Sequence, residues 1–180
     1  GELTLKNIQC SNKKITTPLQ TIQYTCKDGV NEYKPNFAIF GFTYMEIDTE
    51  IDVSADDFTA IAVYSDMEET GFFDSSNELL NKFVKWSTKS NSADLPTDCP
   101  TRERHGWTGD AQIFFNTAAY LFDYATFSEK YIHDVYDWQQ KDGKLPQIVP
   151  YGGVDFFMSW MNGSVGWLDL GVLFPHRFWK

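Results

Sequence analysis

Cysteine is scarce in this sequence, and its histidines are few. The three cysteines, Cys10, Cys26 and Cys99, are too few and too scattered for a disulfide framework or a zinc site. The three histidines also stand apart and form no metal-ligand pattern. The sequence therefore predicts neither a bound metal nor another cofactor.

Positive charge and long apolar runs are also in short supply. The 180 residues carry 15 Lys and Arg against 25 Asp and Glu, and the formal charge of −10 argues against a nucleic-acid partner. No stretch approaches the roughly 18–20 apolar residues that span a bilayer, and no signal pattern opens the chain. We expect a soluble protein without a membrane partner, whether cytoplasmic, periplasmic or secreted.

Aromatic residues, in contrast, make up 17% of the chain, and the hydrophobic content of 42% is enough to bury a sizeable core. Residues 1–69 predict β structure, because turn formers separate short segments rich in Leu, Thr, Ile, Val, Phe and Tyr. These segments are Leu3–Ile8, Gln20–Cys26, Asn36–Ile47 and Phe58–Tyr64. We interpret residues 1–69 as a segment of an antiparallel β-sandwich.

Helical patterns dominate residues 70–180. Ser75 and Glu78 have the spacing of a capping box, with Ser75 as N-cap, ahead of a first amphipathic helix. A second helix is expected from Gly109–Asp110 to Phe122, and a third from Phe127 to about Gln140. The apolar face of the second includes Ile113. After an irregular loop over 144–163, a further helix is expected within 165–174, so the predicted fold class is α+β.

The most chemically dense stretch of the chain is Asp98–Asp110. It holds three carboxylates, two guanidinium groups, an indole and two glycines. Pro100 and the glycines favour a loop. Like charges at short range raise one another's pKa, so one carboxyl can stay protonated near neutral pH, as the proton donor of a glycosidase must.

Glu103 is the candidate proton donor of this loop, because an arginine flanks it on each side and Trp107 offers an apolar wall that would raise its pKa. Asp98 and Asp110 would accept hydrogen bonds from sugar hydroxyls or hold the arginines. Clusters of acids and arginines are more often solvated loops or structural ion pairs, and that alternative stays open.

The string Asp98–Asp110 resembles the signature of the α-L-rhamnosidases of glycoside hydrolase family 78 almost throughout. Further blocks that resemble the family follow in its order: Tyr33–Tyr44, Val63–Asp66, Thr70–Phe73, Asn77–Asn81 and Gly166–Asp169. The likeness covers most of the chain. It departs from the family pattern at His105, where hydrophobic residues are usual, and at Leu168, which replaces a small residue.

The resemblance implies a β-sandwich segment over 1–69 and the first helices of an incomplete catalytic (α/α)6 barrel over 70–180. It implies an inverting release of terminal non-reducing rhamnose from rhamnose-containing glycans or glycosides, with Glu103 as the general acid. Asp98, Asp110 and Arg102 would contact the substrate. Trp107 and Trp167 would line the pocket.

An inverting mechanism also needs a general base, a second carboxylate roughly 6.5–9.5 Å from the acid. In the family this glutamate lies in later barrel helices, and neither Asp155 nor Asp169 matches it. We therefore expect a piece of a longer enzyme that is inactive alone and that meets the rest of its parent chain through exposed barrel faces. A non-catalytic carbohydrate-binding module and a barrel glycosidase for another sugar remain alternatives.

Overall fold

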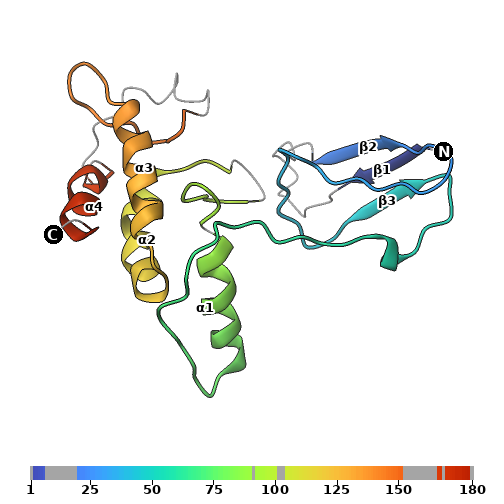
Figure 1. Cartoon of the computed structure of the whole chain (residues 1–180), viewed down its shortest axis with the longest axis horizontal. Coiled ribbons are helices and arrows are strands. Elements are labelled where there is room, and N and C mark those ends of the chain that lie inside the picture. Colours follow the sequence, from blue (N-terminus) through green and yellow to red (C-terminus); the bar gives the residue numbers. More distant parts are fainter. Residues whose placement is uncertain are drawn as a thin grey trace, which may run out of the picture. The chain divides into compact units, whose positions relative to one another are not determined.

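The computed structural model describes residues 2–6, 20–90, 92–100, 104–151, 166, 167 and 169–178. The chain forms two compact units, one of residues 1–62 with 99–103 and one of residues 63–98 with 104–180. The first unit holds the strands and the second holds the α-helices (Figure 1). The chain is thus a mixture of helix and strand, as predicted, and the domain boundary after residue 69 stays a prediction.

The first unit contains a three-stranded antiparallel sheet in the order β2-β1-β3 (Figure 1). Its strands are β1 (Glu2–Lys6), β2 (Thr21–Thr25) and β3 (Glu46–Thr49). Side chains in β2 and β3 alternate between exposed and half-buried, as expected of a sheet with one covered face. The second sheet that a sandwich requires stays a prediction.

The strand predicted over Phe58–Tyr64 is wrong, and the one predicted over Asn36–Ile47 is confirmed only at its end, in β3. Residues 58–64 pair with no strand in the described structure, although Ile61 and Val63 fit the alternating pattern; both are exposed. An alternating sequence favours a strand only where another segment covers its apolar face, and no described segment covers residues 58–64. A short 3₁₀ turn, η1 (Ala55–Asp57), precedes this stretch.

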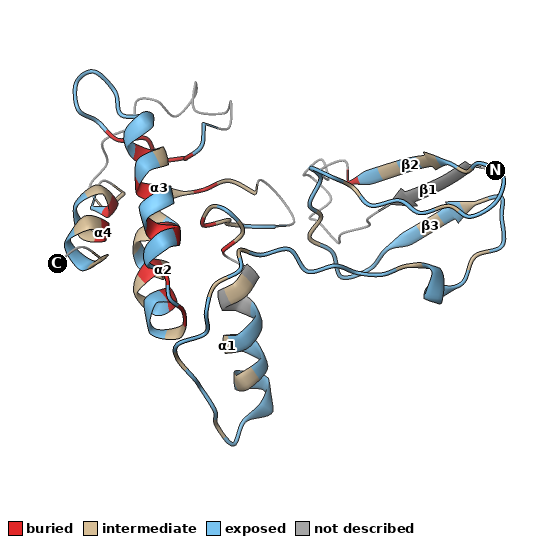
Figure 2. Cartoon of the chain, viewed as in Figure 1, coloured by how far each residue is buried: buried red, intermediate tan, exposed pale blue. Residues whose placement is uncertain are grey.

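The second unit begins its helices with α1 (Glu78–Ser90). The N-cap is Asn77, whose Oδ1 accepts hydrogen bonds from the amides of Leu79 and Leu80 at 3.0 and 3.2 Å, so the assignment to Ser75 is wrong. Ser75 instead bonds Asn81 through its hydroxyl, at 2.8 Å. The apolar face of α1 is largely exposed (Figure 2).

The core of the second unit lies among α2 (Thr108–Leu121), α3 (Ala125–Asp137) and α4 (Leu170–Phe178), where Figure 2 shows the buried residues. Phe115 and Phe174 are its centre, with ring centroids 4.3 Å apart. The spacing that predicted α3 is confirmed, because Phe127, Tyr131 and Val135 are all buried. The helix predicted within 165–174 is also confirmed, as α4.

Pro175 lies inside α4 and has no N–H to donate to the carbonyl of Gly171, four residues earlier. The hydroxyl of Tyr136, from α3, donates to that carbonyl oxygen at 2.8 Å. A side chain of α3 thus replaces the missing helical hydrogen bond and ties the two helices together.

Candidate active site

The dense loop is closed at its base by Asp98 and His105. The amide of Asp98 donates to the carbonyl of His105 at 3.0 Å, and the amide of His105 donates to Oδ1 of Asp98 at 2.8 Å. Arg104, just before this pair, has a left-handed φ of 56°. Arg102 and Glu103, the predicted substrate contact and proton donor, lie outside the described residues.

The loop leads into a short extended segment, residues 106–108, which pairs antiparallel with residues 147–149. The amide of Val149 donates to the carbonyl of Gly106 at 2.9 Å, and the amide of Thr108 donates to the carbonyl of Gln147 at 2.8 Å. A Cβ on Gly106 would lie 2.0 Å from the carbonyl oxygen of Val149, so only glycine allows this approach. The pairing fixes where α2 begins.

A pocket of about 480 Å³ opens beside the first turns of α2. Three of the predicted site residues, Asp98, Asp110 and Trp167, line it together. The pocket is lined by Pro96, Thr97, Asp98, Gly109, Asp110, Gln112, Ile113, Phe114, Gly166 and Trp167. Two carboxylates, two aromatic rings and several aliphatic groups can hold a ligand that carries both hydroxyls and an apolar surface.

Trp107 is not among the lining residues, but its ring lies against that of Trp167, with centroids 5.5 Å apart and planes at 58°. Gly109 determines how close Trp167 can come, since a Cβ at Gly109 would lie 2.5 Å from Cε3 of the indole. The two tryptophans and this glycine therefore form one aromatic wall, of which Trp167 faces the pocket.

Ile113 was predicted to lie on the buried face of α2, and that prediction is wrong. Its side chain is 76% exposed and lines the pocket, while Ala111 and Phe115 carry the helix into the core. The signal was present in the spacing: Ile113 and Phe114 follow Asp110 by three and four residues, so all three share a helix face. Pro96, Thr97 and Gln112 were missed as well, because no local pattern marks them.

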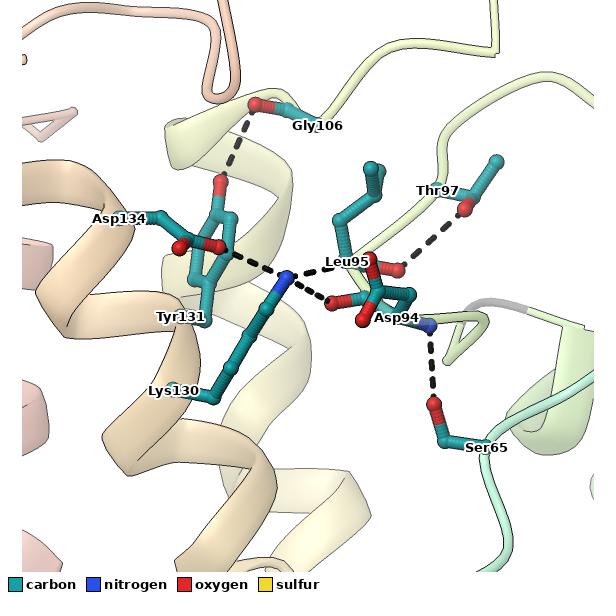
Figure 3. A network of polar contacts seen from close by, with 8 residues as sticks. All are labelled: Ser65, Asp94, Leu95, Thr97, Gly106, Lys130, Tyr131 and Asp134. Carbon is teal, nitrogen blue, oxygen red and sulfur yellow. Dashed lines mark hydrogen bonds and ion pairs between the residues drawn. The ribbon is translucent and has the colours of Figure 1, made fainter.

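A network of polar contacts holds the segment Asp94–Thr97, which directly precedes Asp98 in the sequence (Figure 3). The ammonium of Lys130, on α3, donates to the carbonyl of Asp94 at 2.9 Å and lies 3.2 Å from its Oδ2 and 2.8 Å from Oδ2 of Asp134. Asp94, at a left-handed φ of 67°, donates its amide to the hydroxyl of Ser65. Burial lowers the pKa of Lys130, but the hydrogen bonds to Asp134 and Asp94 outweigh it and raise the pKa.

Tyr131 supports the other end of the loop from the same helix. Its hydroxyl donates to the carbonyl oxygen of Gly106 at 3.1 Å (Figure 3). Burial raises the pKa of this phenol, and the charges of Asp134 and Asp110 add to the effect. Helix α3 thus holds both segments that flank the loop.

Within the described ranges, no three His, Cys, Asp or Glu side chains gather closely enough to hold a metal ion. None of the described helices is both long and apolar enough to cross a membrane.

Residues 68–180 match the family model described as the bacterial alpha-L-rhamnosidase 6 hairpin glycosidase domain. The chain belongs to the α-L-rhamnosidase family. This is glycoside hydrolase family 78, the family that the loop signature resembles, and its members are glycosidases. An alpha-L-rhamnosidase of Alteromonas sp. (strain LOR) is 36% identical over 157 residues, which are 83% of this chain and 16% of that protein. One of Streptomyces avermitilis is 35% identical over 166 residues, 89% of this chain and 16% of that protein.

Two solved α-L-rhamnosidase structures have the same fold over nearly the whole chain. The enzyme from Dictyoglumus thermophilum superposes with a TM-score of 0.82 and 30% identity, over 99% of this chain and 21% of that one. The enzyme from Streptomyces avermitilis, complexed with L-rhamnose, superposes with a TM-score of 0.80 and 31% identity, over 97% and 18%. The chain thus spans about a fifth or less of the length of these family members.

Proposed function

We propose that this chain is part of an α-L-rhamnosidase that hydrolyses terminal non-reducing α-L-rhamnose residues with inversion. The observation that carries the proposal is the pocket that Asp98, Asp110 and Trp167 line together, in a chain of the α-L-rhamnosidase family. Carboxylates accept hydrogen bonds from sugar hydroxyls, and an indole packs against C–H groups. Rhamnose, with a methyl at C5 in place of a hydroxymethyl, offers both kinds of surface.

Glu103 is the proposed general acid. It would give its proton to the glycosidic oxygen as the bond from C1 to that oxygen breaks, and the leaving group would depart as an alcohol. A general base outside this chain would take a proton from the water that attacks the opposite face of C1. The assignment to Glu103 rests on its place in the family signature, between Asp98 and Asp110.

The remaining signature residues would bind the sugar. Asp98, Asp110 and Arg102 would hold its hydroxyls, and Trp107 would back Trp167 in the aromatic wall. Asp98 would have two tasks, since its Oδ1 already accepts a hydrogen bond from the amide of His105. That bond would orient the carboxylate before the substrate arrives.

The proposed architecture is a β-sandwich segment over 1–69 followed by the first helices of an (α/α)6 barrel over 70–180. The exposed apolar face of α1, which includes Leu79, Phe83 and Trp86, supports it, because later barrel helices of a parent chain would cover such a face. Since the proposed base lies in that missing part, these 180 residues alone should have negligible rhamnosidase activity.

The test is hydrolysis of an aryl α-L-rhamnoside by the full-length protein and by its Glu103→Gln variant. We expect kcat to fall by roughly 10²–10⁴-fold, with affinity for L-rhamnose retained, because the amide cannot donate the proton. Glu129→Gln, at an exposed position on α3, is the matched control and should leave kcat unchanged. Equal turnover by Glu103→Gln would contradict the assignment, and L-rhamnose binding without any turnover would identify a binding module.

A further inference from the structure

We propose that Ile113 is a specificity-determining residue that contacts the leaving group of the substrate and favours an apolar one over a sugar. This inference rests on the proposed function and deepens it. It starts from the lining of the pocket along α2: Asp110 lies at the first turn, and Ile113 lies one turn further, next to Gln112.

Gly109, Asp110 and Trp167 indicate where along the axis of α2 a bound sugar would lie. The indole packs directly on Gly109, so a pyranose ring that stacks on Trp167 and bonds Asp110 lies beside the first turn of the helix. Ile113 follows Gly109 by four residues, which is about 6 Å along the helix axis. That distance is comparable to the length of one pyranose ring, so a leaving group that extends from the sugar along α2 would meet Ile113.

The volume of the pocket agrees with a second group beyond the sugar. About 480 Å³ is within the range of about 300–1,000 Å³ that holds drug-sized ligands, which are larger than a single deoxyhexose. The exposed fractions of the lining residues also indicate that Ile113 lies away from the enclosed part of the pocket. Within the part of the chain that the structure describes, Ile113 is 76% exposed, whereas Pro96 is buried and Trp167 half-buried, so Ile113 lies on the open side of the pocket.

Among the described residues of the unit, Ile113 takes no part in the core. Its neighbours Ala111 and Phe115 are buried among α3 and α4, and Phe114, which also lines the pocket, packs against that core. Core contacts therefore hold the helix that carries Ile113, and the ring of Phe114 beside it is held by the same core. An aliphatic side chain there gains free energy by covering apolar surface and offers no hydrogen bond to a sugar hydroxyl.

The experiment compares kcat/KM of the full-length protein for two substrates that share the rhamnosyl group, an aryl α-L-rhamnoside and a rhamnosyl disaccharide. Ile113→Ala should lower kcat/KM for the aryl substrate by about three- to tenfold, less than a fully enclosed contact would give. It should change kcat/KM for the disaccharide, and inhibition by L-rhamnose, by less than about twofold. Ile113→Gln, of similar length but polar, should repeat the aryl-specific loss.

Val172→Ala is the matched control, because Val172 is 70% exposed on α4 and does not line the pocket. Val172→Ala should leave kcat/KM unchanged for both substrates. Equal losses on both substrates, no loss on either, or the same loss in the control would overturn the role of Ile113 while rhamnosidase activity stands. If the unsubstituted protein hydrolyses neither rhamnoside, the proposed function itself fails, and the inference with it.

Discussion

The hydroxyl of Tyr131 on α3 donates a 3.1 Å hydrogen bond to the carbonyl oxygen of Gly106, the residue that follows the loop closed by Asp98 and His105. The same carbonyl accepts the amide of Val149 at 2.9 Å. Both phenol and carbonyl are buried, so water cannot replace the bond without opening the core. The start of α2, and with it Asp110, is therefore held in place from two directions.

Tyr131→Phe should destabilise the fold by about 1 kcal/mol, because Gly106 keeps its bond from Val149 and loses only one of two donors. For a chain of this size the melting temperature should fall by about 2–4 °C. Thermal unfolding followed by circular dichroism measures it. Tyr136→Phe is the control: it removes the 2.8 Å bond to Gly171 at an exposed site, where water can substitute, and a drop as large as that of Tyr131→Phe would refute the argument from burial.

Alkaline pH should destabilise the chain through its buried phenols. Burial raises the pKa of both Tyr124 and Tyr131 above the ordinary value, although a hydrogen bond with Ser92 offsets part of the effect at Tyr124. The folded state then holds protons that the unfolded state releases above about pH 10. The stabilisation is therefore complete below about pH 10 and is lost as pH rises beyond it.

The measurement is urea unfolding at a series of pH values from about 8 to 11, with tyrosinate absorbance recorded in parallel. We expect these two phenols to ionise only as the chain unfolds. Tyr131→Phe should show a shallower loss of stability with pH. An unchanged slope, or full ionisation of all nine tyrosines before unfolding, would contradict the prediction.

Apolar spacing predicted helix α3 correctly, and Phe127, Tyr131 and Val135 face the core, so period and burial agree. It also predicted α1, although the apolar face of α1 is largely exposed, because a helix makes its backbone hydrogen bonds within itself. A strand needs a partner strand, and the alternation over Phe58–Tyr64 misled because no described strand pairs with it. Asn77 displaced Ser75 as the N-cap because both residue types suit the position, and only the backbone geometry decides between them.

The sequence predicted those site residues that lie within one continuous stretch, Asp98–Asp110. The structure places Asp98 and Asp110 in the lining of one pocket, and their role in binding sugar stays a prediction. Trp167 was expected at the pocket from the family resemblance alone. Its contact with Gly109, 58 residues earlier in the sequence, is one that no periodicity reveals. Ile113 was assigned to the core because an apolar residue at helical spacing is usually buried.

Gly109→Ala should weaken binding of L-rhamnose about tenfold or more. The added Cβ would lie 2.5 Å from the indole of Trp167, so the ring must move away from the pocket position it now holds. Alanine at a helix position otherwise stabilises by up to about 1 kcal/mol relative to glycine. Titration of the full-length protein with L-rhamnose, followed by tryptophan fluorescence, measures the change. A more stable variant with unaltered affinity would show that Trp167 does not contact the sugar.

Two substitutions of Asp98 distinguish its two proposed roles, binding sugar hydroxyls and closing the loop through the amide of His105. Asp98→Asn keeps an oxygen that can accept the amide of His105, now at 2.8 Å, but removes the charge; Asp98→Ala removes both. If the charge binds sugar hydroxyls, both variants should bind L-rhamnose at least about tenfold more weakly, since a charged hydrogen bond contributes about 1.5–3 kcal/mol.

If the carboxylate also closes the loop, only Asp98→Ala should lose stability, by about 1–2 kcal/mol, because it leaves the amide of His105 without that acceptor. Calorimetric titration with L-rhamnose and thermal unfolding of the same samples give both quantities. Equal stability of the two variants would remove the loop-closing role. Full affinity in Asp98→Asn would show instead that geometry, and not charge, is what Asp98 contributes to the sugar site.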